Sequence, residues 1–131
     1  MPLIRQKDKV LYPELSYLIC GLCFKAHNEL GSFLSEKQYG DALENLFKIN
    51  NVNYSRESEL PISFEGEKPG HNITDFIIDN RVILEIKAKN MITRDDYYQI
   101  KRYLISAKKQ LGILVNFRRN TLQPKRVLNQ S

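Results

Sequence analysis

The chain has 131 residues, of which 42% are hydrophobic and 27% carry a formal charge. This length is enough for one domain with its own hydrophobic core, which we expect to span residues 1–131, and the composition excludes a disordered or fibrous chain. No apolar run approaches the roughly 20 residues of a membrane-spanning helix. Residues 1–9 are polar and lack the apolar segment of a secretory signal, so we expect a cytoplasmic protein without a membrane partner.

The formal net charge is +5, and the positive side chains cluster in the C-terminal part of the sequence. Such clustering suits a polyanionic partner, above all nucleic acid, although a solvated surface that promotes solubility explains it equally well. The candidate nucleic-acid contacts are Lys101, Arg102, Arg118 and Arg119.

Apolar residues at helical spacing predict two helices in the first part of the chain. The first runs from Pro13, a residue suited to a helix start, to about residue 29, and Gly31 ends it. The second covers about residues 34–49. A third helix is predicted over residues 93–110, with a threonine cap and acidic residues in its first turn.

Extended segments are predicted between and after these helices. Residues 53–65 indicate a first strand, and residues 74–89 a hairpin that turns at Asp79-Asn80. Residues 111–117 and 123–128 supply two more strands. The order of two helices, three strands, a helix and two strands predicts an α/β fold with a mixed central sheet flanked by helices.

The hairpin carries charge within its apolar strands. Glu85 and Lys87 are two positions apart and so share one face of a strand, and the tight turn brings Asp75 of the partner strand close to Glu85. Two converging carboxylates are costly unless a cation neutralises them, and Mg²⁺ prefers carboxylate oxygens. The three residues indicate either a metal site with an adjacent ammonium group or an exposed ladder of Glu and Lys.

Two of the predicted helices offer further polar side chains. Glu36 shares a helical stripe with Tyr39 and Leu43, so it is either a third ligand or a first-turn acid at the solvent end of that stripe. Gln99 and Tyr103 lie one turn apart on the third helix, where they either line the same cleft or pack in the core.

The sequence also contains a C-x-x-C pair, Cys20 and Cys23, followed by His27. Because this pair falls inside an apolar helix, we interpret both cysteines as buried, reduced core residues, and not as a redox pair or zinc ligands. His27 is expected to pack or cap near the following bend. No glycine-rich phosphate loop, G-x-S-x-G or H-E-x-x-H motif is present, which removes those enzyme classes.

Together these residues resemble a known family. Asp75 followed by Glu85-Ile86-Lys87 resembles the D…ExK signature of the PD-(D/E)XK nuclease superfamily, which has the restriction-endonuclease-like fold. Gln99-x-x-x-Tyr103 resembles the QxxxY motif of the RecB and lambda-exonuclease branch of that superfamily.

Nearly the whole chain, about residues 11–128, is similar to the small bacterial and archaeal GxxExxY proteins of the same superfamily. Phe33 stands where the glycine that names that family would fall, whereas Glu36 and Tyr39 keep the rest of the motif. The matching stretches are YPELSY (12–17), HNELG (27–31), EKQYGDAL (36–43), LEIKA (84–88) and ILVNF (113–117).

The resemblance implies a nuclease that hydrolyses phosphodiester bonds of nucleic acid, DNA foremost, with Mg²⁺ or Mn²⁺ as cofactor. It implies that Lys87 orients the attacking water or stabilises the transition state, and that Gln99 and Tyr103 support the site. The implied metal ligands are Glu36, Asp75, Glu85 and the carbonyl of Ile86.

A second interpretation is a catalytically inactive nuclease-fold module that binds nucleic acid or a protein partner. A chain of 131 residues has little room for a separate target-recognition domain. Its length therefore favours this module, or an enzyme that works as a homodimer or with an accessory protein.

Overall fold

The computed structural model of the chain describes residues 11–129. Residues 1–9, whose polar composition supported the expected cytoplasmic location, lie outside this range. The described part contains α2 (Pro13–Leu30), α3 (Glu36–Ile49), β1 (Tyr54–Glu59), β2 (Ile73–Ile78), β3 (Val82–Lys87), α4 (Arg94–Ala107), β4 (Leu111–Asn116) and β5 (Lys125–Leu128). This is the predicted element order, and it confirms the α/β fold.

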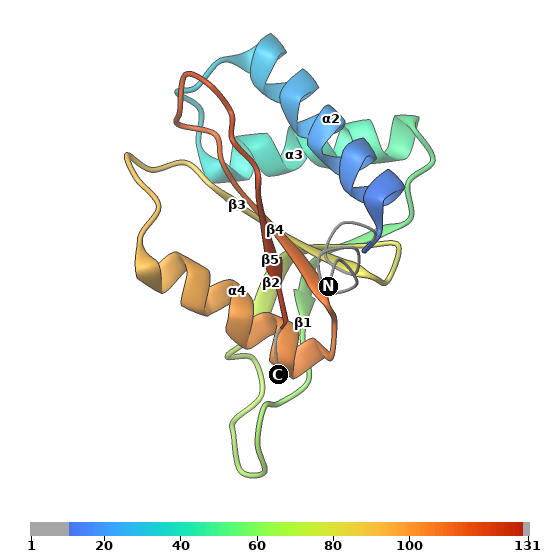
Figure 1. Cartoon of the computed structure of the whole chain (residues 1–131), viewed down its shortest axis with the longest axis vertical. Coiled ribbons are helices and arrows are strands. Elements are labelled where there is room, and N and C mark those ends of the chain that lie inside the picture. The colour runs from blue at the N-terminus through green and yellow to red at the C-terminus, as the bar shows by residue number, and fades with distance from the viewer. Residues whose placement is uncertain (1–10, 130–131) are drawn as a thin grey trace, which may run out of the picture.

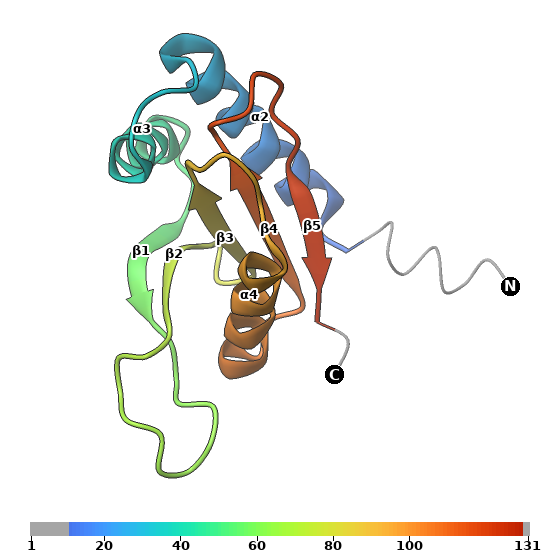
Figure 2. The same ribbon diagram turned by 90° about the vertical axis from the view of Figure 1, so that its left-hand side faces the viewer.

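The strands form one five-stranded mixed sheet in the order β1-β2-β3-β4-β5. Neighbouring strands are antiparallel except β3 and β4, which are parallel and are connected through α4. Helices α2 and α3 cover one face of the sheet and α4 covers the other (Figures 1 and 2). The start of α3, the end of β3 and the start of α4 lie on the same side of the molecule (Figure 1).

Local capping sets the start of α3. The Ser35 hydroxyl accepts a hydrogen bond from the Gln38 backbone N–H, and the Gln38 side chain accepts one from the Ser35 backbone N–H. This capping box starts the helix at Glu36, two residues later than the predicted start at residue 34.

The ends of α4 also differ from the predicted bounds. Thr93 and Asp96 form the capping box at its start. The helix ends at Ala107 instead of residue 110 because Lys108 adopts a left-handed conformation, with a φ of 55°.

The first strand is shorter than the predicted range of 53–65. β1 ends at Glu59, because Pro61 has no backbone N–H to continue the ladder. The backbone N–H of Leu60 still donates to the Asn72 carbonyl at 2.8 Å, and residues 61–72 then leave the sheet as a protruding loop (Figures 1 and 2).

The hairpin turns at Asp79 and Asn80 as predicted, where φ is 53° and 55° and the Arg81 N–H donates to the Ile78 carbonyl at 2.9 Å. Pairing begins again with Ile78 and Val82, so the connection has one residue more than the predicted two-residue turn. No helix among residues 11–129 combines the length and the hydropathy that crossing a membrane would take.

Side-chain alternation along β3 sends the apolar residues Leu84 and Ile86 into the core beneath α2 and α3. Ile83 instead packs in the second core, beneath α4. Since Glu85 and Lys87 follow Ile83 at spacings of two, they emerge on the α4 face of the sheet.

Candidate active site

The β2–β3 hairpin opens into a fork at its acidic residues. Regular pairing ends at Phe76 and Leu84. Beyond that pair, Oε2 of Glu85 accepts a hydrogen bond from the backbone N–H of Asp75 at 2.8 Å, and Oδ2 of Asp75 accepts one from the backbone N–H of Ile86 at 2.8 Å. The two carboxylates thus replace backbone ladder bonds and hold the strands a side chain apart.

Glu85 is deeply buried in this fork, with 3% of its surface exposed. The hydroxyl of the fully buried Thr74 donates a second hydrogen bond to Oε2 of Glu85 at 2.6 Å. The bonds from Thr74 and Asp75 fix the position of one carboxylate oxygen.

The electrostatics of the fork disfavour two negative charges. Burial, followed by the negative charge of Asp75, raises the pKa of Glu85 to about 7. Burial also raises the pKa of Asp75, and the nearby Glu36 carboxylate raises it further. Both carboxyls would therefore gain from a neighbouring cation.

Lys87 is held on the α4 face of the fork. Its ammonium group donates to Oε1 of Gln99 at 2.8 Å and lies 3.9 Å from Oδ1 of Asp96. Gln99 in turn hydrogen-bonds to Tyr103, whose pKa is raised by burial and by the charge of Glu85. The structure therefore brings Lys87 and Gln99 together near Glu85. Tyr103 is buried in the core beneath α4, with 6% of its surface exposed, so the alternative of core packing also holds for it.

Glu36 reaches the fork from the α3 side. It is the first residue of α3, and its Oε2 accepts a hydrogen bond from the backbone N–H of Ala88 at 3.2 Å. Glu36, Asp75 and Ile86 line one cavity of about 250 Å³, together with Arg56. Glu36 is thus both a first-turn acid and a neighbour of the fork.

The three acids do not close into one ligand set. Within residues 11–129, no group of three or more His, Cys, Asp or Glu side chains is placed to hold a metal ion. Mg²⁺ is usually held by one or two carboxylates and keeps several waters. The Asp75–Glu85 pair meets that smaller requirement, because the bonds just described engage only Oδ2 and Oε2. The donor set therefore fits a hard divalent cation.

Sequence reasoning assigned no site role to two polar residues near the fork. Asp96 is buried and accepts hydrogen bonds from Lys89 at 2.9 Å and from the Thr93 backbone N–H at 2.7 Å. Asn116 is also buried. Its side-chain amide accepts a hydrogen bond from the Lys89 N–H at 3.1 Å and donates one to the Lys89 carbonyl at 2.8 Å. The capping-box spacing of Thr93 and Asp96 was a usable signal, whereas nothing in the sequence marked Asn116.

The four predicted nucleic-acid contacts fall into two groups. Lys101 and Arg102 are exposed on α4, and Arg119 is exposed in the loop that joins β4 to β5. The guanidinium of Arg118, in contrast, donates to the carbonyls of Ser32, at 2.8 Å, and Leu34, at 3.4 Å. Arg118 therefore stabilises the loop between α2 and α3.

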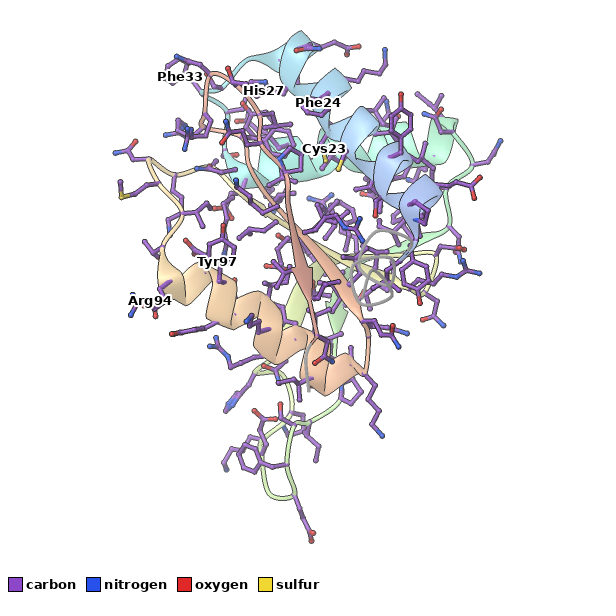
Figure 3. The ribbon with its side chains drawn as sticks, viewed as in Figure 1. Cys23, Phe24, His27, Phe33, Arg94 and Tyr97 are labelled. Carbon is purple, nitrogen blue, oxygen red and sulfur yellow. The ribbon has the colours of Figure 1, made fainter. Side chains whose placement is uncertain are left out.

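The C-x-x-C pair lies away from the fork. Cys23 is fully buried in the core beneath α2, Cys20 is half-buried, and both are free thiols. Burial raises the pKa of both. The ring of His27 lies near Phe117 and its Nε2 lies 2.7 Å from the Arg119 carbonyl, so His27 packs at the end of α2, as predicted, and contacts the β4–β5 loop. Figure 3 shows Cys23 and His27 on α2.

A comparison with protein families matches residues 13–127 to the PD-(D/E)XK nuclease superfamily. The match covers most of the chain, so the protein belongs to this superfamily, and the mixed sheet with flanking helices agrees with its restriction-endonuclease-like fold. Comparisons with curated proteins and with solved structures find no match to this chain.

Proposed function

We propose that the protein is a divalent-metal-dependent nuclease that hydrolyses phosphodiester bonds, with DNA as its substrate. The observation that supports this most directly is the fork between β2 and β3. There Glu85 bonds the Asp75 N–H at 2.8 Å, and Lys87, two residues further on, is held by Gln99 at 2.8 Å. Membership of the PD-(D/E)XK superfamily supports nuclease chemistry in general.

Asp75, Glu85 and the carbonyl of Ile86 would hold Mg²⁺ or Mn²⁺, while Glu36, outside this set, lines the same cavity as Asp75. When bound, such an ion supplies a nucleophile at neutral pH and offsets charge on the phosphoryl oxygens. The remaining work falls to the side chains around it. Thr74 fixes one oxygen of Glu85 through its hydroxyl, at 2.6 Å, and leaves the other to face the ion.

Lys87 supplies positive charge next to the carboxylates. In this proposal its ammonium group orients the attacking water or stabilises negative charge that develops on the phosphate. Gln99 holds that ammonium group at 2.8 Å, and Tyr103, which bonds to Gln99, supports both. A lysine fixed before substrate binds loses less entropy in the transition state.

The substrate backbone would contact positive side chains on the same molecule. Lys101 and Arg102 on α4 and Arg119 on the β4–β5 loop are exposed, and each would pair with a phosphate. The overall charge of +5 favours association with any nucleic acid.

A cleavage assay with single-stranded and duplex DNA, in Mg²⁺ or Mn²⁺ and in EDTA, tests the proposal. We expect metal-dependent cleavage by the wild type and at least a hundredfold loss in Asp75→Asn and in Lys87→Ala. Lys25→Ala is the matched control, because Lys25 is an exposed lysine of α2 that pairs with Glu29, at 3.0 Å. Equal cleavage by all four preparations would reveal a contaminating nuclease and remove the proposal.

The inactive module keeps one observation in its favour. Oxygens of Glu36, Asp75 and Glu85 all accept backbone N–H hydrogen bonds, so the acids have a structural role without any ion. Thermal unfolding separates the two candidates, because an ion that binds only the folded protein raises its melting temperature. A rise with Mn²⁺ that Asp75→Asn abolishes supports the nuclease, and no rise supports the module.

A further inference from the structure

The loop between α2 and α3 displays one large aromatic side chain to solvent. Phe33 is 85% exposed, more than any other large hydrophobic residue in the described part of the chain. Single exposed apolar residues are common on proteins and need no special cause. Phe33 differs from them because hydrogen bonds fix its loop and because this loop leads into Glu36 at the start of α3.

The backbone on both sides of Phe33 is fixed by hydrogen bonds. Arg118 donates to the carbonyls of Ser32, at 2.8 Å, and Leu34, at 3.4 Å. The Tyr39 hydroxyl bonds to the Gly31 carbonyl and accepts from the Leu34 N–H at 3.4 Å. Ser32 is buried and Leu34 packs on the core, so of these three consecutive residues it is Phe33 that points outward.

A second loop, which carries an exposed positive charge, is fastened to the loop of Phe33. The bonds of Arg118 join the β4–β5 loop to the loop of Phe33. His27 adds a further contact, since its Nε2 lies 2.7 Å from the carbonyl of Arg119. The side chain of Arg119 is exposed, so an aromatic face and a guanidinium sit on two loops that are fastened to each other.

This pair of loops borders the candidate active site. Phe33 precedes Glu36, the first residue of α3, by three positions, and Glu36 lines the cavity that contains Asp75. Arg94 and Tyr97 at the start of α4 lie on the same side of the molecule as Phe33 (Figure 3). A strand whose phosphate reaches Asp75 would therefore have its next nucleotides near Phe33.

We propose that Phe33 and Arg119 form a subsite for an unpaired nucleotide, whose base stacks on the Phe33 ring and whose phosphate pairs with Arg119. The subsite rests on the proposed nuclease function, and it identifies the substrate as single-stranded DNA or a duplex with an unpaired end. Stacking needs an exposed base face, which a base pair inside a duplex does not offer. Because the loop is held before binding, little ordering entropy opposes the contact.

Binding measured in EDTA tests this without any cleavage. The probes are a single-stranded DNA that carries 2-aminopurine and a fully paired duplex of the same sequence, each titrated with the whole chain. We expect Phe33→Ala to weaken single-strand binding about tenfold and to leave duplex binding within twofold. Phe33→Tyr should restore single-strand binding and the quenching of 2-aminopurine.

Phe64→Ala is the matched control, because Phe64 is 62% exposed on the separate loop that precedes β2. It should bind both probes like the wild type. Single-strand affinity that does not change in Phe33→Ala overturns the subsite, as does an equal loss for both probes or a change in the oligomeric state of that variant. An unchanged melting temperature excludes misfolding as the cause of a loss.

The outcome is independent of that of the cleavage assay. Metal-dependent cleavage that needs Asp75, together with unaltered binding by Phe33→Ala, would retain the nuclease and remove the subsite. Selective loss of single-strand binding without any cleavage by the wild type would retain the subsite in a binding module and remove the nuclease.

Discussion

Glu85 and Asp75 are joined across the fork by the hydrogen bond from the Asp75 N–H to Oε2 of Glu85, at 2.8 Å. This contact keeps two buried acids next to each other, and the charge of Asp75 raises the pKa of Glu85. The repulsion between these two acids therefore destabilises the folded protein to an extent that depends on pH and on bound cations.

The first prediction concerns stability against pH in EDTA. The pKa of Glu85 rises from 4.5 to about 7 on folding, so the folded protein binds more protons than the unfolded chain between these values. The free energy of unfolding should therefore fall as the pH rises from 5 to 8, by an amount on the order of 2 kcal/mol. Urea unfolding measures the decrease. Glu85→Gln should flatten it, and an equally steep decrease in that variant would contradict the assignment.

The second prediction concerns the support of Lys87. Gln99→Ala removes the acceptor that holds the ammonium group at 2.8 Å, while Asp96 stays 3.9 Å away. We expect kcat for DNA cleavage to fall about a hundredfold, because a misplaced catalytic group loses most of its effect. The Michaelis constant and the melting temperature should change little. The exposed Gln110→Ala is the control, and unchanged kcat in Gln99→Ala would show that Lys87 needs no such support.

The third prediction concerns Asn116. Its side-chain amide bonds both the N–H and the carbonyl of Lys89, at 3.1 and 2.8 Å, in a buried position. Asn116→Ala should lower the free energy of unfolding by about 1–3 kcal/mol, because buried backbone groups lose their partners. Denaturant unfolding gives the value. Asn120→Ala, an exposed position in the next loop, should stay within about 0.5 kcal/mol of the wild type.

The fourth prediction contrasts two glycines inside helices. A Cβ at Gly21 would meet no heavy atom within 4 Å, so Gly21→Ala should stabilise the protein by about 1 kcal/mol through helix propensity. A Cβ at Gly40 would lie 2.5 Å from Nη2 of Arg56. That guanidinium is held by Asp41 at 2.7 Å and by Glu44 at 3.0 Å, so Gly40→Ala should destabilise by about 1 kcal/mol. Thermal unfolding of both variants decides, and a stabilised Gly40→Ala would contradict this packing.

Much of the fold could be predicted because it depends on neighbours in the sequence. The spacing of apolar residues placed the helices, and the Asp79-Asn80 pair marked the turn that brings Asp75 close to Glu85, although the connection is one residue longer than predicted. The errors in the predicted bounds of helices and strands also have local causes. Capping at Ser35 moved one helix start, and Pro61 ended β1 early.

The sequence by itself determined which residues we propose for the chemistry, since the D…ExK spacing and the hairpin turn lie within a single short segment. Only the tertiary structure decided that Glu36 bonds Ala88, 52 positions away, and that Arg118 holds the loop at Ser32, 86 positions away. The physical reason is range. Helix periodicity and turn geometry act between residues a few positions apart, whereas these hydrogen bonds form only after the helices have packed on the sheet.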